Sequence, residues 1–292
     1  MGMSKAFSGQ GGNTPLVPSW LDDDSAPAAI SVPDGSAANT IDSQPPPEPA
    51  TAPSYRPLPP IADPTRFSAA RNNFSRFASS GGRDRRNLGR AIAHYVGSSA
   101  GGARSAATRM GSSRGASGRL LGFLTDSATR GAAAALRALN LGALAGRPIE
   151  EVFIGLVDYV CPDGGSIDEG IARAAFIETI ADLASVGIVD LDGLTASQIQ
   201  TVFEMYATHA IEARICNDIG ANAVTLPADS RAAARVQAQL HDFIRRGVAD
   251  ALTALQPTIA TLTPDQVLGF VGQIYEHAFQ ILQLMGDEEA ET

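Results

Sequence analysis

The stretch TPDQVLGFVGQIYEHAFQILQLMG, residues 263–286, decides the fold class. Its apolar residues alternate spacings of four and three, and they are Val267, Val271, Ile274, Ala278, Ile281 and Met285. This spacing places them on one face of an α-helix. Thr263 and Gln266 have the spacing of a capping box, in which two side chains satisfy free backbone N–H groups at a helix start. The stretch therefore predicts a long amphipathic helix with a defined beginning.

Upstream of this helix, the same signals recur as far as residue 148. Ser166–Glu169 and Thr195–Gln198 repeat the capping-box pattern, and residues 229–255 carry another helical stripe. Pro148 followed by two glutamates suits a first helical turn. No run of alternating apolar and polar residues indicates a sheet. The sequence predicts an all-α fold with a helical bundle over 148–286 and a frayed acidic tail over 287–292.

Residues 66–147 form an arginine-rich region that also reads as helical. Order is expected to begin at Asp63-Pro64, which suits a helix start. A first helix with an apolar face follows and ends at Gly81-Gly82, and a second spans roughly 83–96. The glycine- and serine-rich segment after it predicts one or two short, broken helices, and one more helix precedes Arg147-Pro148.

Residues 1–65 have the composition of a disordered tail, because prolines are dense and apolar residues sparse. The first residues lack the apolar run of a signal peptide, and Ala6 stands where a myristoylation signal has Ser or Thr. The leader contains Pro15, Pro18 and Trp20, the only tryptophan. The prolines make the segment rigid, and the indole offers an aromatic surface that a partner protein can bind. We expect this leader to be a recognition segment.

Charge is strongly segregated along the chain, although the formal net charge is only −9. Residues 66–137 hold thirteen arginines and two acidic residues, whereas 138–292 hold seven arginines and twenty-two acidic residues. Three partners remain open for the arginine block: nucleic acid, an acidic protein face that includes this chain's own bundle, or solvent. The candidate contact residues in this block are Arg83, Arg86, Arg90, Arg104 and Arg109.

Catalytic and cofactor motifs are not found in the sequence. The four histidines, His94, His209, His241 and His277, fall in separate helical patterns and form neither HExxH nor a zinc-spaced pair. Cys161 and Cys216 lie in apolar helical sequence and predict buried, reduced thiols of a cytoplasmic protein. No apolar segment reaches membrane-spanning length. We expect a non-enzymatic protein without metal or cofactor; an enzyme that uses Cys161 or one of the histidines is the weaker alternative.

Several strings of the sequence resemble the QatB family of the bacterial Qat anti-phage system. They are the leader MG…GG…PLVPSW, LGRAIAHYVGSSAGGARSAATRMG, GGSIDEGIARAAFIETIADLA and IEARICNDIG. The resemblance implies a non-enzymatic component that acts beside an ATPase (QatA), an enzyme similar to the 7-cyano-7-deazaguanine synthase QueC (QatC) and a TatD-like nuclease (QatD).

In related defence systems, QueC-like enzymes are associated with joining a deazaguanine to an N-terminal glycine of a partner protein. The matching position here is Gly2, so the resemblance implies an adaptor whose tail accepts that modification. The alternative is a nucleic-acid-binding helical module that uses the arginine-rich residues 66–137.

Overall fold

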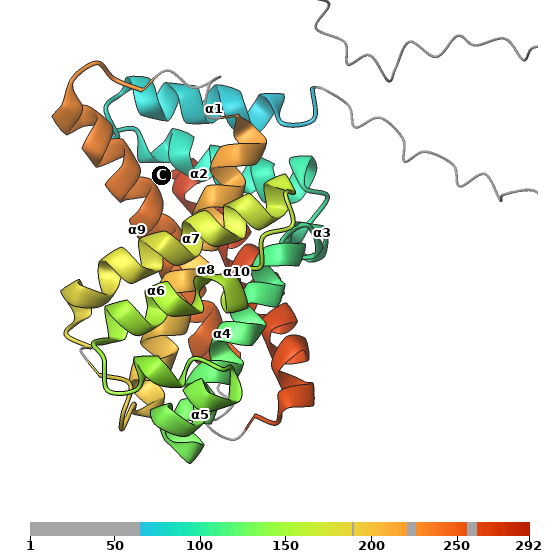
Figure 1. Ribbon diagram of the computed structural model, residues 1–292. Coiled ribbons are helices and arrows are strands. Elements are labelled where there is room, and N and C mark those ends of the chain that lie inside the picture. Colours follow the sequence, from blue (N-terminus) through green and yellow to red (C-terminus); the bar gives the residue numbers. More distant parts are fainter. Residues whose placement is uncertain (1–64, 189, 221–225, 256–261) are drawn as a thin grey trace, which may run out of the picture. The chain divides into compact units, whose positions relative to one another are not determined.

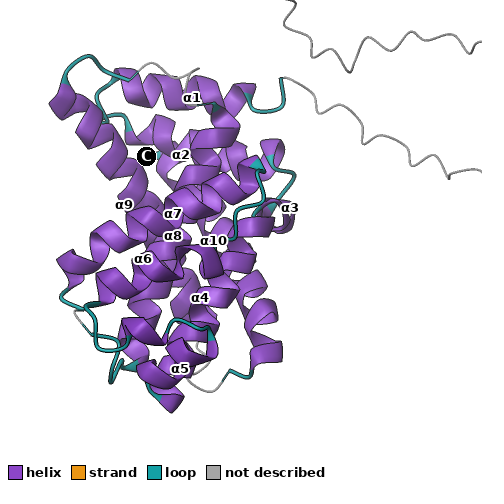
Figure 2. Cartoon of the chain, in the orientation of Figure 1, coloured by secondary structure: helices purple, strands orange, loops and turns teal. Residues whose placement is uncertain are grey.

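The computed structural model describes residues 65–188, 190–220, 226–255 and 262–292, in which ten α-helices and no strand occur (Figures 1 and 2). The helices are α1 (Ser68–Ser79), α2 (Arg85–His94), α3 (Ala103–Arg109), α4 (Gly111–Arg130), α5 (Ala132–Ala138), α6 (Ile149–Val160), α7 (Ile167–Leu183), α8 (Ala196–Ile219), α9 (Ser230–Leu255) and α10 (Pro264–Glu291). The all-α prediction is confirmed. The Asp63-Pro64 start and residues 1–64 of the tail lie outside the described residues.

The helix starts follow the local sequence signals. Thr195 Oγ1 accepts from the Gln198 N–H at 3.2 Å, and the Gln198 side chain accepts from the Thr195 N–H at 2.9 Å. The same reciprocal bonds open α10 at Thr263 and join Ser166 to Glu169 at the start of α7. These bonds satisfy N–H groups that the first helical turn leaves free. The three predicted capping boxes are therefore present.

Helix α10 packs against α2, α3, α4 and α9. Its predicted apolar face is buried except at Ile281 and Met285, which are half-buried. The helix does not fray at residue 287 but continues through Glu291, so that expectation is wrong. Its last turns are held by α2: Arg85 Nε lies 2.6 Å from Glu289 Oε1, and Arg86 Nε donates to the Ala290 carbonyl at 2.9 Å. The C-terminus accordingly lies beside α2 (Figure 1).

The crossing of α2 and α10 is close because two glycines meet there. A Cβ atom added at Gly89 would lie 2.7 Å from the Gly286 carbonyl oxygen, and one at Gly286 would lie equally close to the Gly89 carbonyl. Both contacts are with backbone, which cannot rotate away as a side chain does. The crossing distance therefore depends on both residues lacking a side chain.

The arginine-rich helices share one apolar core with the later helices, and this core is continuous across residue 147. Helix α4 extends over 20 residues, longer than the short, broken helices expected from its glycine and serine content. Leu120, Leu121 and Leu124 of α4 are fully buried, and α4 packs against α7, α8 and α10. Tertiary burial thus overrides weak local helix propensity in this segment.

Candidate functional site

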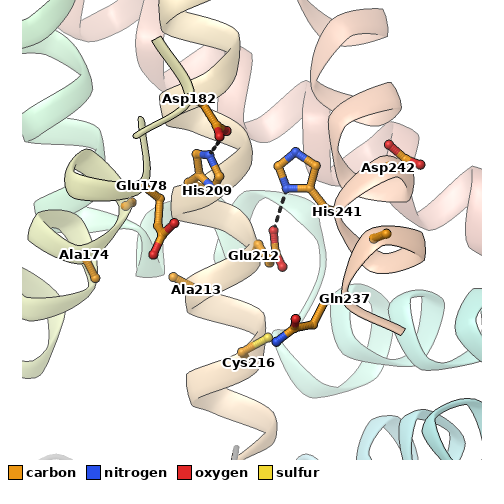
Figure 3. Close-up of a pocket in the computed structure, with 12 residues that line it drawn as sticks. Ala174, Glu178, Asp182, His209, Glu212, Ala213, Cys216, Gln237, His241 and Asp242 are labelled. Carbon is orange, nitrogen blue, oxygen red and sulfur yellow. Dashed lines mark hydrogen bonds and ion pairs between the residues drawn. The ribbon is translucent and has the colours of Figure 1, made fainter. Parts of the chain in front are cut away.

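An open pocket of about 680 Å³ lies between α7, α8 and α9. Figure 3 shows its polar side chains: Glu178 and Asp182 come from α7, His209, Glu212 and Cys216 from α8, and Gln237, His241 and Asp242 from α9. Three neighbouring helices thus supply one hollow with imidazole and carboxylate groups.

The two histidines of this pocket are each paired with a carboxylate. His209 Nε2 lies 2.8 Å from Asp182 Oδ2, and His241 Nδ1 lies 2.9 Å from Glu212 Oε2 (Figure 3). The two imidazole rings lie close together, with centroids 5.1 Å apart. We call His209, Glu212, His241 and Asp182 the histidine cluster. It combines groups that could hold a divalent metal ion or transfer protons.

The electrostatics of this pocket are negative. Four carboxylates, Glu178, Asp182, Glu212 and Asp242, line it, and none of its lining residues is an arginine or lysine. The hydrogen bond that His241 donates to the Glu212 carboxylate raises the pKa of His241; partial burial opposes this shift, and the charge of Glu212 adds to it. The pocket therefore favours a positively charged occupant.

A second polar cluster surrounds the buried Asp218 side chain at the C-terminal end of α8. Asp218 Oδ2 accepts from the Tyr95 hydroxyl at 3.0 Å and from Arg109 NH2 at 3.0 Å, and Arg214 Nε lies 3.3 Å away. Arg214 also pairs with Asp168 of α7. We call these five residues the Asp218 cluster. They join helices α3, α7 and α8 and the π-helical turn Tyr95–Ser99 that follows α2.

The pKa values in this cluster follow from burial and paired charge. Burial and the neighbouring Asp218 carboxylate raise the pKa of Tyr95 well above its usual range, so its hydroxyl stays a donor. Burial opposes the charge of Arg214, but Asp218 and Asp168 outweigh it and raise the pKa of the guanidinium. Arg214 therefore stays positively charged at every physiological pH, and the negative carboxylates of Asp168 and Asp218 both contact it.

The arginine block contacts the chain's own acidic and carbonyl groups at several of the candidate positions. Arg104 Nε lies 3.2 Å from Glu276 Oε1 of α10, Arg109 belongs to the Asp218 cluster, and Arg86 binds the Ala290 carbonyl. Arg83, in the turn before α2, is exposed, and Arg90 of α2 is half-buried. Three of the five candidate residues therefore have partners within the chain itself.

The other residues that the sequence singled out lie as follows. Gly2, Pro15, Pro18 and Trp20 are outside the described residues. Cys161 is buried, and burial raises the pKa of its thiol to about 11. Burial, with a smaller contribution from the Glu212 charge, raises the pKa of Cys216 to about 12. Neither thiol is activated as a nucleophile, because it is the thiolate that reacts.

No sequence pattern predicted the histidine cluster, because its two histidines lie on different helices. One local signal was present: His209 and Glu212 are three residues apart, and residues at that spacing share a helix face. His241 lies on the next helix, 32 positions after His209, and no local pattern indicates that distance. Only the packing of α8 against α9 brings the two imidazoles together.

These features define an all-helical protein with a charge cluster around the buried Asp218 and an open histidine–carboxylate pocket, and no helix in the described ranges is long and apolar enough to cross a membrane. The sequence model of the family described as "Qat anti-phage system associated protein QatB" matches residues 101–282, more than half of the chain. The chain belongs to the QatB family and is a component of the Qat anti-phage system. No curated protein and no solved structure matches it.

Proposed function

We propose that this chain is a non-enzymatic adaptor of the Qat system and that its N-terminal Gly2 accepts a deazaguanine-type modification from a QueC-like partner enzyme. The observation that carries the proposal is the family match over residues 101–282, combined with a leader of quite different composition before it. The leader joins Gly2, a glycine-rich segment and the PLVPSW string to a proline-rich spacer. This arrangement suits a segment that enters an enclosed enzyme site.

The chemistry of Gly2 supports this role. Removal of Met1 exposes a glycyl α-amine, whose pKa is ordinarily about 8, so a useful fraction is the neutral nucleophile near pH 7. The amine bears no side chain beside it and can attack an ATP-activated carboxylate, forming an amide and releasing the activating group and a proton. Pro15, Pro18 and Trp20 are proposed to bind the enzyme surface while Gly2 reaches its active site.

The helical body supports docking better than catalysis. Both cysteine thiols have raised pKa values and no described residue activates them. On the outside, Ile154 of α6 and Ile177 of α7 are exposed and border one groove. Exposed apolar patches of this kind are surfaces that partner proteins cover. We propose that the body docks QatC, and through it QatA or QatD, in the cytoplasm.

Intact-mass measurement tests the acceptor role. The chain is co-expressed with its Qat neighbours, purified and weighed beside the Gly2→Ser variant and the chain expressed alone. We expect a mass gain only in the co-expressed chain with Gly2, mapped to the N-terminal peptide. An unmodified N-terminus, or a gain that survives replacement of Gly2, contradicts the proposal. Deletion of residues 3–20 behind an N-terminal glycine should also prevent the gain.

Co-purification tests the docking surface separately. Replacing Ile154 and Ile177 by Glu should reduce recovery of the partner enzyme, whereas Leu284→Glu, equally exposed on α10, should not. Unchanged recovery with the double variant, or equal loss with the control, would show that this groove is not the docking surface.

Nucleic-acid binding by the arginine block is the competing function. The arginine to be replaced in its test is chosen by whether its side chain already pairs within the chain. Arg109 lies in the Asp218 cluster, so Arg109→Glu disturbs folding as well as surface charge. Arg83 is exposed and its side chain makes no ion pair with the described residues, so Arg83→Glu is the cleaner variant. Nucleic-acid binding that falls steeply with salt and is lost in Arg83→Glu would favour the competing function.

A further inference from the structure

We propose that the histidine cluster is a binding site for a divalent transition-metal ion of the zinc type, with His209, Glu212 and His241 as its ligands. One candidate ligand atom from each of these residues lies within 4.8 Å of the other two. Two of the residues come from α8 and the third from α9, so the ion would join two helices that pack side by side. The inference is independent of the proposed role of Gly2.

The ligand atoms need only a small movement to bind one ion. Ligands bound to Zn²⁺ at about 2.0–2.1 Å in a tetrahedral arrangement lie about 3.3 Å from one another. The His241–Glu212 pair is already closer than this, at 2.9 Å, and the widest pair is within 4.8 Å. All three side chains are half-buried at the edge of an open pocket, where rotation of χ angles changes these distances without moving the helices.

Asp182 supplies the contact that metal-binding histidines ordinarily have. Its carboxylate lies 2.8 Å from His209 Nε2, which fixes the orientation of the ring and leaves the other ring nitrogen for a metal. Asp182 is placed by α7, so a third helix takes part in the site. We assign Asp182 as a positioning residue of the site.

The donor set selects the class of metal. Two imidazoles and a carboxylate suit Zn²⁺ and its first-row neighbours, whereas Mg²⁺ and Ca²⁺ prefer oxygen ligands alone. The acidic lining of the pocket, with no arginine or lysine among its residues, lowers the cost of bringing in a dication. Three protein ligands leave a coordination position that faces the pocket, which solvent or a small anionic group can occupy.

The test uses the untagged full chain after chelator treatment and dialysis. It is titrated with Zn²⁺ by calorimetry and with Co²⁺ by visible absorption, which reports the coordination number of the ion. We expect one ion per chain with micromolar or tighter affinity, a four- or five-coordinate Co²⁺ spectrum, and a raised Tm in the presence of Zn²⁺ because only the folded chain binds. Binding no tighter than millimolar overturns the proposal.

Variants identify the ligands. His209→Gln and His241→Gln should each weaken Zn²⁺ binding by more than about 100-fold, beyond the 10–100-fold that loss of an orienting partner costs. His94→Gln, an exposed histidine on α2, and Cys216→Ser, the thiol of the same pocket, should leave affinity unchanged. Circular dichroism confirms that each variant is folded. Zn²⁺ affinity retained in folded His209→Gln and His241→Gln, or lost in either control, overturns the assignment.

Discussion

Helix α8 carries residues of both the Asp218 cluster and the histidine cluster, and the surroundings of the two clusters differ. The Asp218 side chain is 6% exposed, and the two arginines in contact with it oppose its charge. Asp182 in the histidine cluster is 46% exposed, its partner is a histidine, and the cluster opens into a pocket. Since breaking a buried ion pair costs much more than breaking an exposed one, the first cluster should serve stability and the second should be free to serve a ligand.

Three of the strings that resemble the QatB family meet in the Asp218 cluster. Tyr95 and Arg109 come from the arginine-rich string, Asp168 from the GGSIDEG string, and Arg214 and Asp218 from IEARICNDIG. These strings are far apart along the chain, and the Asp218 cluster is where they are in contact. The two histidines of the open pocket lie outside all of the strings. The strings that resemble the family therefore contain every residue of the Asp218 cluster but not the two histidines of the histidine cluster.

Asp218→Ala should cause the largest loss of folding stability among the variants. It leaves Arg109 and Arg214 without the carboxylate that both contact, and loss of one partner of a buried pair costs about 3–5 kcal/mol. Urea unfolding followed by circular dichroism measures the loss. Asp250→Ala, an exposed acid on α9, is the matched control and should change stability by less than about 0.5 kcal/mol. Equal losses of stability in the two variants would show that the buried Asp218 contributes no more to stability than an exposed acidic residue.

Gly89→Ala should cause the next largest loss of stability, because α2 leads into the π-helical turn that places Tyr95 in the Asp218 cluster. The new methyl group would meet the Gly286 carbonyl, and overpacking of this kind costs about 1–3 kcal/mol. Gly269→Ala on α10 is the control: nothing lies within 4 Å of its new Cβ, so it should stabilise the helix by up to about 1 kcal/mol. Opposite shifts in Tm for the two variants are the expected result, and shifts of the same sign would contradict the close crossing.

Tyr95→Phe should have a smaller effect. It removes the hydroxyl that donates to Asp218 but leaves both arginines in contact with the carboxylate. A hydrogen bond to a charged group contributes about 1.5–3 kcal/mol, and we expect the lower end because Asp218 keeps its other donors. Tyr159→Phe is the control, since no hydrogen bond joins its hydroxyl to the described residues. A loss as large as that of Asp218→Ala would mean that Tyr95, not the arginines, satisfies the carboxylate.

The helices and their starts could be predicted from the sequence because their signals are local. The α10 stripe and the three capping boxes each depend on residues close together in the chain, and all are present. The length of α4 and the ordered end of α10 could not be predicted, since both depend on contacts with distant helices. The same holds for the sites. The arginine block was visible as a charge pattern, but its pairing with Asp218 and Glu276, and the meeting of His209 with His241, depend on helix packing.

Asp182→Ala should have the smallest effect on stability. It tests most directly whether the histidine cluster binds a ligand while the Asp218 cluster stabilises the fold. Its carboxylate is half-exposed and its partner His209 is charged only when protonated, so its loss should cost less than about 1 kcal/mol in urea unfolding of the metal-free chain. The same variant should weaken Zn²⁺ binding by about 10–100-fold, because His209 loses the group that orients it. Asp218→Ala, assayed while still folded, should keep its Zn²⁺ affinity. If Asp182→Ala instead destabilised the metal-free chain by several kcal/mol, the histidine cluster would be part of the structural core, and its open pocket would not mark a ligand site.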